Sequence, residues 1–160
     1  MLDDLILYFV YKTKGYITKT QLVKFLYLAD LYSVKWTEKQ LTNLDWYYYN
    51  YGPWDKEIDA ALNRLGEDKI SQKKDGNAIL IQMKDPSSEL NFKPSEGLRL
   101  MLDNIRREWS GLSSERINEL LSYVYSTAPM VDVKAKHKPE DMAKLNLWLE
   151  RKKLVEELGV

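Results

Sequence analysis

The chain is 160 residues long, which suits a single domain that can bury a core without disulfides or a structural metal ion. It carries 24 basic and 24 acidic residues, and this formal charge of zero lacks the basic excess that is typical of proteins that hold nucleic acid. It contains no cysteine, which excludes disulfides, thiolate nucleophiles and cysteine-based zinc sites.

Apolar residues recur at helical spacing near the start of the chain and predict two helices. The first covers about residues 2–14, where Gly15 can end it. The second begins with a capping-box pattern, in which Thr18 is followed three residues later by Gln21, and it continues to about Trp36. Apolar side chains line one face of the second helix, so we expect that face to pack on the core.

Aromatic residues dominate the next segment, where six of the nine residues from Trp46 to Trp54 are Trp or Tyr. Residues 41–51 predict a short buried segment, extended or helical, because both faces of a strand would be aromatic. Pro53 suits the first turn of a further helix, since a proline lacks the N–H that would be unpaired there. Gly66 can close that helix.

Two interpretations of this aromatic block stay open. Tyr and Trp side chains are typical of binding hot spots, and they are equally typical of a core on which helices pack. Stacking of nucleic-acid bases is a third interpretation, but it usually needs a basic groove, which the block lacks. We expect the block to be mostly core, with one or two rings at the surface. The expected exposed edge is our candidate partner-binding site: Tyr51, Gly52, Pro53 and Trp54.

The second half of the chain predicts a small hairpin followed by further helices. These elements are a hairpin at about residues 69–84, a loop at 85–94, helices over about 95–109 and 113–127, an irregular basic loop at 131–139 and a final helix over 140–158. The expected fold is therefore mainly α, a single domain over residues 1–160 with about six helices and one small β-hairpin.

The sequence names no catalytic chemistry. The single histidine, His137, lies among lysines, and no nucleophile motif frames a serine. Asp55 and Asp59 could share a helix face, which is more typical of a solvated surface than of a catalytic pair. Metal-ligand and nucleotide-binding patterns are absent, so we expect no enzyme, no cofactor and no metal site. No apolar run reaches the ~20 residues of a membrane span, and we expect a cytoplasmic protein.

Two groups of lysines offer an alternative function. If the predicted hairpin acted as the wing of a winged helix, these lysines could contact phosphates. The competing interpretation is that they keep a strand edge and a loop soluble, which the zero net charge favours. The lysines are Lys69, Lys73 and Lys74 at the hairpin, and Lys134, Lys136 and Lys138 in the basic loop.

Two elements resemble a known family. Residues 21–30, QLVKFLYLAD, resemble the L-x-K-L-L-Y-x-A-D/H helix of the Panacea antitoxin domain, also called the SocA-like domain. Lys24 and Asp30 of this segment fall outside the apolar stripe. Residues 51–54, YGPW, resemble the Y-G-P-V element of that family, at a fitting distance along the chain. Residues 125–130 depart from the family pattern, because they keep a proline but lack its usual histidine and tryptophan.

The resemblance implies a mostly helical protein that acts by binding and carries no catalytic residues. Its partner would be a toxin encoded beside it, which such domains neutralise or deliver to a protease. The alternatives are a winged-helix-like regulator that binds nucleic acid, and a protein associated with a phage or mobile element that has another role.

Overall fold

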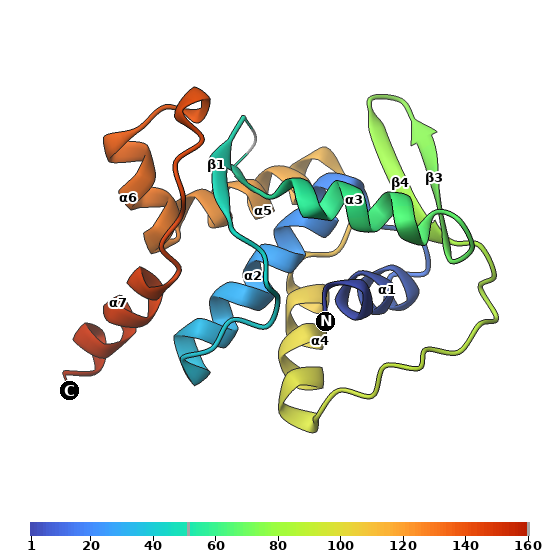
Figure 1. Ribbon diagram of the computed structural model, residues 1–160, viewed down its shortest axis with the longest axis horizontal. Helices are drawn as coiled ribbons and strands as arrows, with labels where there is room; N and C mark the ends of the chain where they lie inside the picture. Colours follow the sequence, from blue (N-terminus) through green and yellow to red (C-terminus); the bar gives the residue numbers. More distant parts are fainter. Residues whose placement is uncertain (51, 160) are drawn as a thin grey trace.

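Helix α2, Lys19–Thr37, runs through the middle of the molecule, and most other elements are arranged around it (Figure 1). The computed structural model describes residues 1–50 and 52–159. The other elements in these residues are α1 (Leu2–Lys12), β1 (Tyr47–Tyr49), β2 (Gly52–Trp54), α3 (Lys56–Leu65), β3 (Ile70–Asp75), β4 (Ala78–Met83), α4 (Glu96–Trp109), α5 (Ser114–Ser126), α6 (Ala128–Lys136), a 3-10 helix (Pro139–Asp141) and α7 (Trp148–Leu158). The prediction of a mainly helical fold is confirmed.

Helix α2 is buried on all of its faces through three turns in its middle. The predicted capping box starts it: Thr18 accepts a hydrogen bond from the backbone N–H of Gln21, whose side chain accepts one from the backbone N–H of Thr18. Every residue from Gln21 to Leu31 is buried, since α1, α4, α5, α7, β2 and β4 all pack against this helix. The expectation of a single buried face was therefore too narrow.

Two antiparallel hairpins flank α2. The predicted one, β3–β4, turns at Gly76, which has the positive φ of +62° that a tight turn favours. The second pairs β1 with β2, in register from Tyr47 opposite Trp54 to Tyr49 opposite Gly52. The expectation that Pro53 begins a helix is wrong. Pro53 lies in β2, which can hold a proline because it is an edge strand, and Asp55 caps α3 instead.

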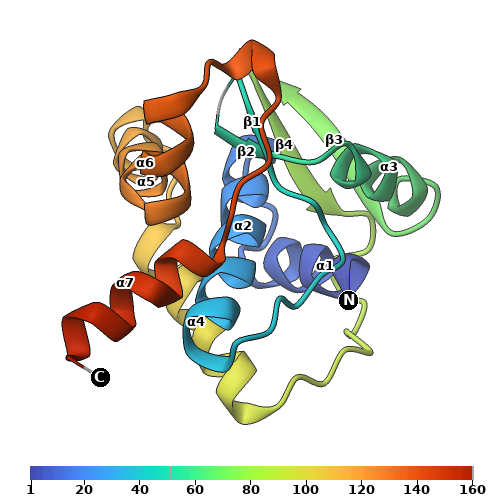
Figure 2. The ribbon, with the colours of Figure 1, turned by 60° about the vertical axis from the view of Figure 1, so that its left-hand side comes forward.

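The C-terminal quarter differs from the expected basic loop and long helix. Residues 128–136 form helix α6, because Pro129 stands in its first turn, where a proline starts a helix rather than ending one. The final helix begins at Trp148, not near residue 140. The residues before it run alongside β1, where Tyr48 N–H donates to Ala143 O (2.8 Å) and Leu145 N–H donates to Trp46 O (2.8 Å) (Figure 2).

Glu150 connects the last two helices. Its side chain is buried, and its Oε2 accepts a hydrogen bond from the backbone N–H of Ala128 (2.7 Å), at the N-terminus of α6. The side chain of Thr127, the residue before α6, does not cap this helix. A carboxylate at this end also interacts favourably with the helix dipole. The carboxylate of α7 therefore serves as the cap of α6.

We predict that Glu150→Ala lowers the free energy of unfolding by about 2 kcal/mol, the scale for a lost cap that leaves a buried N–H unpaired. Urea denaturation followed by circular dichroism measures this change. The matched control is Glu157→Ala on the exposed last turn of α7, which should change stability by less than about 0.5 kcal/mol. Equal losses for the two variants would contradict the proposed role of Glu150.

Candidate functional site

The aromatic block is held on α2 by two charged side chains, and the first is Asp30. This carboxylate is fully buried. Its Oδ1 accepts from the backbone N–H groups of Leu41 (3.1 Å) and Thr42 (3.0 Å). Its Oδ2 accepts from Thr42 Oγ1 (2.5 Å) and from the indole Nε1 of Trp46 (2.9 Å). Burial raises the pKa of Asp30, and these hydrogen bonds act in the opposite direction. Asp30 thus fixes the loop that leads into β1.

Trp46 is the aromatic ring that this arrangement buries. It is 1% exposed and packs edge-on against Tyr27, with ring centroids 5.5 Å apart. The Tyr27 hydroxyl in turn shares a hydrogen bond with Thr127 Oγ1 (2.8 Å), at the junction between α5 and α6. The first ring of the block is therefore core. Because its indole N–H is bonded to Asp30, the ring is also fixed in orientation.

Lys24 is the second charged anchor, one and a half turns before Asp30. Its side chain is 3% exposed, and its Nζ donates to the carbonyl of Pro53 in β2 at 3.3 Å. Desolvation lowers the pKa of this amine to about 8. Sequence analysis placed Lys24 and Asp30 outside the apolar stripe, and the structure corrects this, because both lie in the core beneath the hairpin β1–β2.

Gly52 is required by the backbone of this hairpin. Its φ of +101° lies in a region that residues with a side chain rarely adopt. A Cβ at this position would lie 3.6 Å from Lys24 Nζ and 3.6 Å from the hydroxyl of Tyr125 on α5. Gly52 and Pro53 are both buried, so the expectation that they form an exposed edge is wrong. Tyr51, which was assigned to the same edge, lies outside the described residues.

The surface of the hairpin is formed by a stacked pair of rings. Tyr49 is 38% exposed, and Trp54 is half-buried. Their ring centroids are 4.9 Å apart and the ring planes differ by 29°. The two residues come from opposite strands, so each holds the other in place. Among the described residues of the predicted edge, only Trp54 lies near the surface. Its stacking partner is Tyr49.

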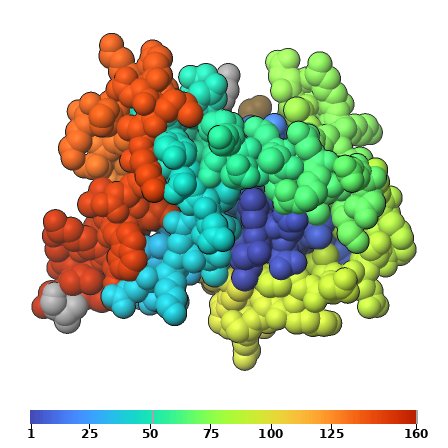
Figure 3. Space-filling view, in the orientation of Figure 1, coloured from blue at the N-terminus to red at the C-terminus, as the bar shows by residue number. Residues whose placement is uncertain are grey.

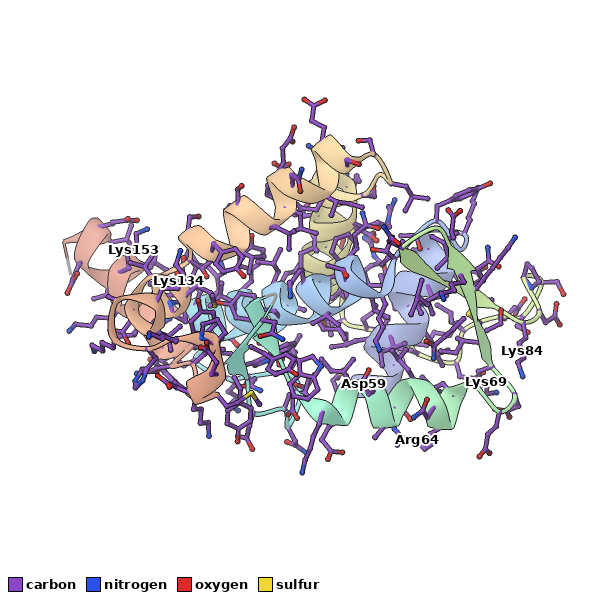
Figure 4. The ribbon with its side chains drawn as sticks, turned by 90° about the horizontal axis from the view of Figure 1, so that it is seen from above. Asp59, Arg64, Lys69, Lys84, Lys134 and Lys153 are labelled. Carbon is purple, nitrogen blue, oxygen red and sulfur yellow. The ribbon has the colours of Figure 1, made fainter. Side chains whose placement is uncertain are left out.

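The six candidate lysines do not form one basic face. Lys69 lies beside the β3–β4 hairpin and Lys134 lies at the opposite end of the molecule, as Figure 4 shows. Lys134 stands over the ring of Tyr125 at 4.9 Å, and Lys136 pairs with Asp132 at 2.8 Å, whereas Lys138 is exposed. Lys73 and Lys74 are exposed on β3. The candidate lysines therefore fall into two separate groups.

Helix α3 would be the recognition helix of a winged helix, since it precedes the hairpin. It carries two basic and two acidic residues, so it offers no basic surface. Arg64 and Asp59, both labelled in Figure 4, are engaged in ion pairs: Arg64 with Asp3 at 2.5 Å, and Asp59 with Lys19 at 2.5 Å. The arginine of α3 is thus already paired with a carboxylate of the protein.

The candidate catalytic groups are separate from one another. Asp55 caps α3 by accepting from the N–H of Glu57, and it also accepts from the N–H of Asp45. His137 is exposed and lies 3.3 Å from Asp141. Within residues 1–50 and 52–159 no group of three or more His, Asp or Glu residues could hold a metal ion. In the same residues no helix is both long and apolar enough to cross a membrane.

Comparison with known proteins agrees with the family resemblance of residues 21–30 and 51–54, which contact each other in the structure through Lys24 and Pro53. The model of the family described as antitoxin SocA-like, Panacea domain, matches residues 22–128, which is more than half of the chain. This span begins on α2 and includes both anchors, the hairpin β1–β2 and helices α3 to α5. No curated protein and no solved structure matches the chain.

Lys24 should make stability depend on pH. The pKa of this amine is about 8 in the folded protein, below the usual value of 10.5. Above pH 8 the unfolded chain therefore binds more protons at this site than the folded one, so stability rises with pH. Relative to Lys24→Met, the wild type should gain about 2 kcal/mol between pH 7 and pH 9.5.

The measurement is urea denaturation of both proteins at a series of pH values. Titration of the tyrosines contributes to both curves, so it cancels in their difference. Curves that stay parallel over this range would show that Lys24 keeps its ordinary pKa, and the buried position would then be wrong.

Proposed function

Because the chain belongs to the antitoxin SocA-like, Panacea domain family, we propose that it neutralises a toxin by binding it rather than by catalysis. Family membership is the observation that carries this proposal. The partner would be the product of a neighbouring gene. The winged-helix alternative receives no support from the site, since the lysines lie at opposite ends of the molecule and α3 is not basic.

The hairpin β1–β2 offers a preorganised contact for such a partner. Tyr49 and Trp54 form a stacked pair on strands that Lys24 and Asp30 hold to the core. Aromatic side chains that are already fixed lose little conformational entropy on binding. We therefore assign partner binding to Trp54 with Tyr49, and we assign to Gly52 and Pro53 the shape of the hairpin. The role proposed for Tyr51 stays a prediction.

Co-expression tests the function directly. The product of each neighbouring gene is expressed alone and together with the chain, and growth and complex formation are measured. We expect one product that inhibits growth alone, that is harmless with the chain, and that co-purifies with it at high salt. Absence of any growth inhibition, complex or rescue would overturn the proposal. Binding of duplex DNA that decreases steeply with salt would instead support the regulator.

Delivery of the toxin to a protease is the finer part of the proposal, and the lifetime of the toxin tests it. After synthesis is stopped, a toxin that is handed to a protease should disappear faster in cells that contain the chain than in cells without it. A toxin that is only sequestered should persist in the complex. If the toxin lasts as long or longer in cells that contain the chain, delivery to a protease is ruled out and neutralisation by binding alone remains.

We predict that Tyr49→Ala weakens the complex with the toxin at least tenfold, the scale for loss of an aromatic hot spot. The matched control is Tyr16→Ala, because Tyr16 is 66% exposed and lies between α1 and α2, where the next residues pair with strand β4 rather than with the hairpin β1–β2. Isothermal titration calorimetry with the purified toxin measures both affinities. Equal affinities for the two variants would remove the hairpin from the interface.

Trp54→Ala tests the other half of the pair. Trp54 is half-buried, so its loss should cost about 1–3 kcal/mol of stability, between the values for surface and core positions. Urea denaturation measures this cost. A loss above this range would mean that the ring belongs to the core and that its main role is structural.

A further inference from the structure

The C-terminal half of helix α7 is only weakly attached to the rest of the protein. The first turn of this helix is held, since Glu150 caps α6 and the guanidinium of Arg151 donates to the carbonyl of Lys35 (2.8 Å). The helix then extends away from the other elements to a corner of the molecule (Figure 2 and Figure 3). From Lys152 to the end of α7 no residue of the described chain is buried.

One side of α7 combines apolar and charged side chains at helical spacing. Positions that differ by three, four, seven or eight lie on the same side of a helix. The side chains that share this face are Trp148, Lys152, Val155 and Glu156. All four line one surface hollow, whose volume is about 700 Å³. Trp148 is 50% exposed, and tryptophan is among the residues on which protein interfaces most depend.

The two charges of this face are not engaged within the protein. Among residues 1–50 and 52–159, the side chains of Lys152 and Glu156 form no ion pair and no hydrogen bond with each other or with a third residue. The other charged groups of the hollow, Glu38 and Arg151, pair with each other at 3.2 Å. The face is therefore neutral and carries one available cation and one available carboxylate in a fixed order along the helix.

The order of these two charges opposes the dipole of α7. A helix favours acidic side chains near its N-terminus and basic side chains near its C-terminus. Glu156 stands in the last turn, where no basic residue balances it, and Lys152 precedes it by four positions. A lysine before a glutamate at this spacing is also the less favourable of the two orders. A positive charge placed beside the last turn from outside would therefore stabilise this end of the helix.

We propose that this face of α7 binds the same face of a second copy of the chain, with the two helices antiparallel about a two-fold axis near Leu154. Two-fold symmetry exchanges positions at equal distances from the axis, so Lys152 of each copy lies opposite Glu156 of the other. Val155 packs near the axis, and Trp148 covers the end of the other helix. Each last turn then lies beside the N-terminal half of its neighbour and receives the positive charge that it lacks.

The charges select this arrangement over a parallel one. In a parallel pair Lys152 would face Lys152 and Glu156 would face Glu156, and like charges oppose association. One helix face is smaller than the ~800 Å² per partner of a standard stable interface, so the dimer should be weak and should depend on protein concentration. Self-association of this kind needs no toxin, and α7 lies beyond residues 22–128 that the family model matches, so it is independent of the proposed function.

Sedimentation equilibrium of the full chain at a series of concentrations tests this pairing. The wild type should form dimers, and Lys152→Glu or Glu156→Lys should each weaken self-association by about tenfold or more, because each creates two like-charge contacts. The matched control is Glu157→Lys, which makes the same change on the opposite side of the helix and should stay within about twofold of the wild type. Circular dichroism confirms that each variant is folded.

Mixing the two single variants tests the antiparallel register. At these two positions Lys152→Glu carries only carboxylates and Glu156→Lys carries only amines, so a mixed pair regains both contacts. We expect the mixture to form heterodimers under conditions in which each variant alone is monomeric. The double variant, with Lys152→Glu and Glu156→Lys in one chain, should dimerise like the wild type, because the exchange keeps every contact between opposite charges.

The contrary results are equally clear. A wild-type chain that stays monomeric at every concentration would overturn the dimer. A dimer that neither charge variant weakens, or that Glu157→Lys weakens equally, would remove this face of α7 from the interface. Failure of the mixed variants to associate would overturn the antiparallel register. None of these results bears on neutralisation of a toxin, which the co-expression experiment tests separately.

Discussion

The structure depends on the complete burial of the middle of helix α2, from Gln21 to Leu31. A helix that is enclosed on every face cannot leave a charged side chain unsatisfied, because a buried charge without partners is strongly destabilising. Asp30 meets this constraint with four hydrogen bonds from the segment that follows α2. Lys24 meets it only in part, with one bond to Pro53 and a lowered pKa. The hairpin β1–β2 is thus part of how α2 can be buried at all.

The same need to satisfy buried charged side chains explains the two sequence motifs that resemble the family. The lysine and aspartate of the α2 motif act on Pro53 and Trp46, which belong to the aromatic block some twenty residues later in the chain. The two motifs are therefore one structural unit, and they explain the shape of the hairpin rather than the choice of partner. Tyr49 and Trp54 are not among the buried residues of the core, and we propose that they serve recognition.

Sequence analysis succeeded where the signal is local. The capping box at Thr18, the hairpin predicted at residues 69–84 and the helix starts predicted near residues 95 and 113 each depend on a few neighbouring residues. It failed where distant partners decide. Lys24 and Asp30 looked peripheral because the groups that satisfy them come from another segment. Residues 142–147 look helical by periodicity, but residues 143–145 form backbone pairing with β1 instead. The surface hollow beside the C-terminal end of α2 could not be found from sequence, since the residues that line it come from α2, α4, α5 and the loop after α2.

The segment that runs beside β1 shows that the residues matched by the family model are fewer than the residues that build the folded core. The family model ends at residue 128, yet Met130, Val133, Leu145 and Leu147 beyond it are buried in the same core. A foreign sequence joined at that boundary would replace α6 and α7 and would uncover the side of α2 on which α7 packs. A transfer of this domain that keeps its core closed therefore has to carry the C-terminal helices along with the matched residues.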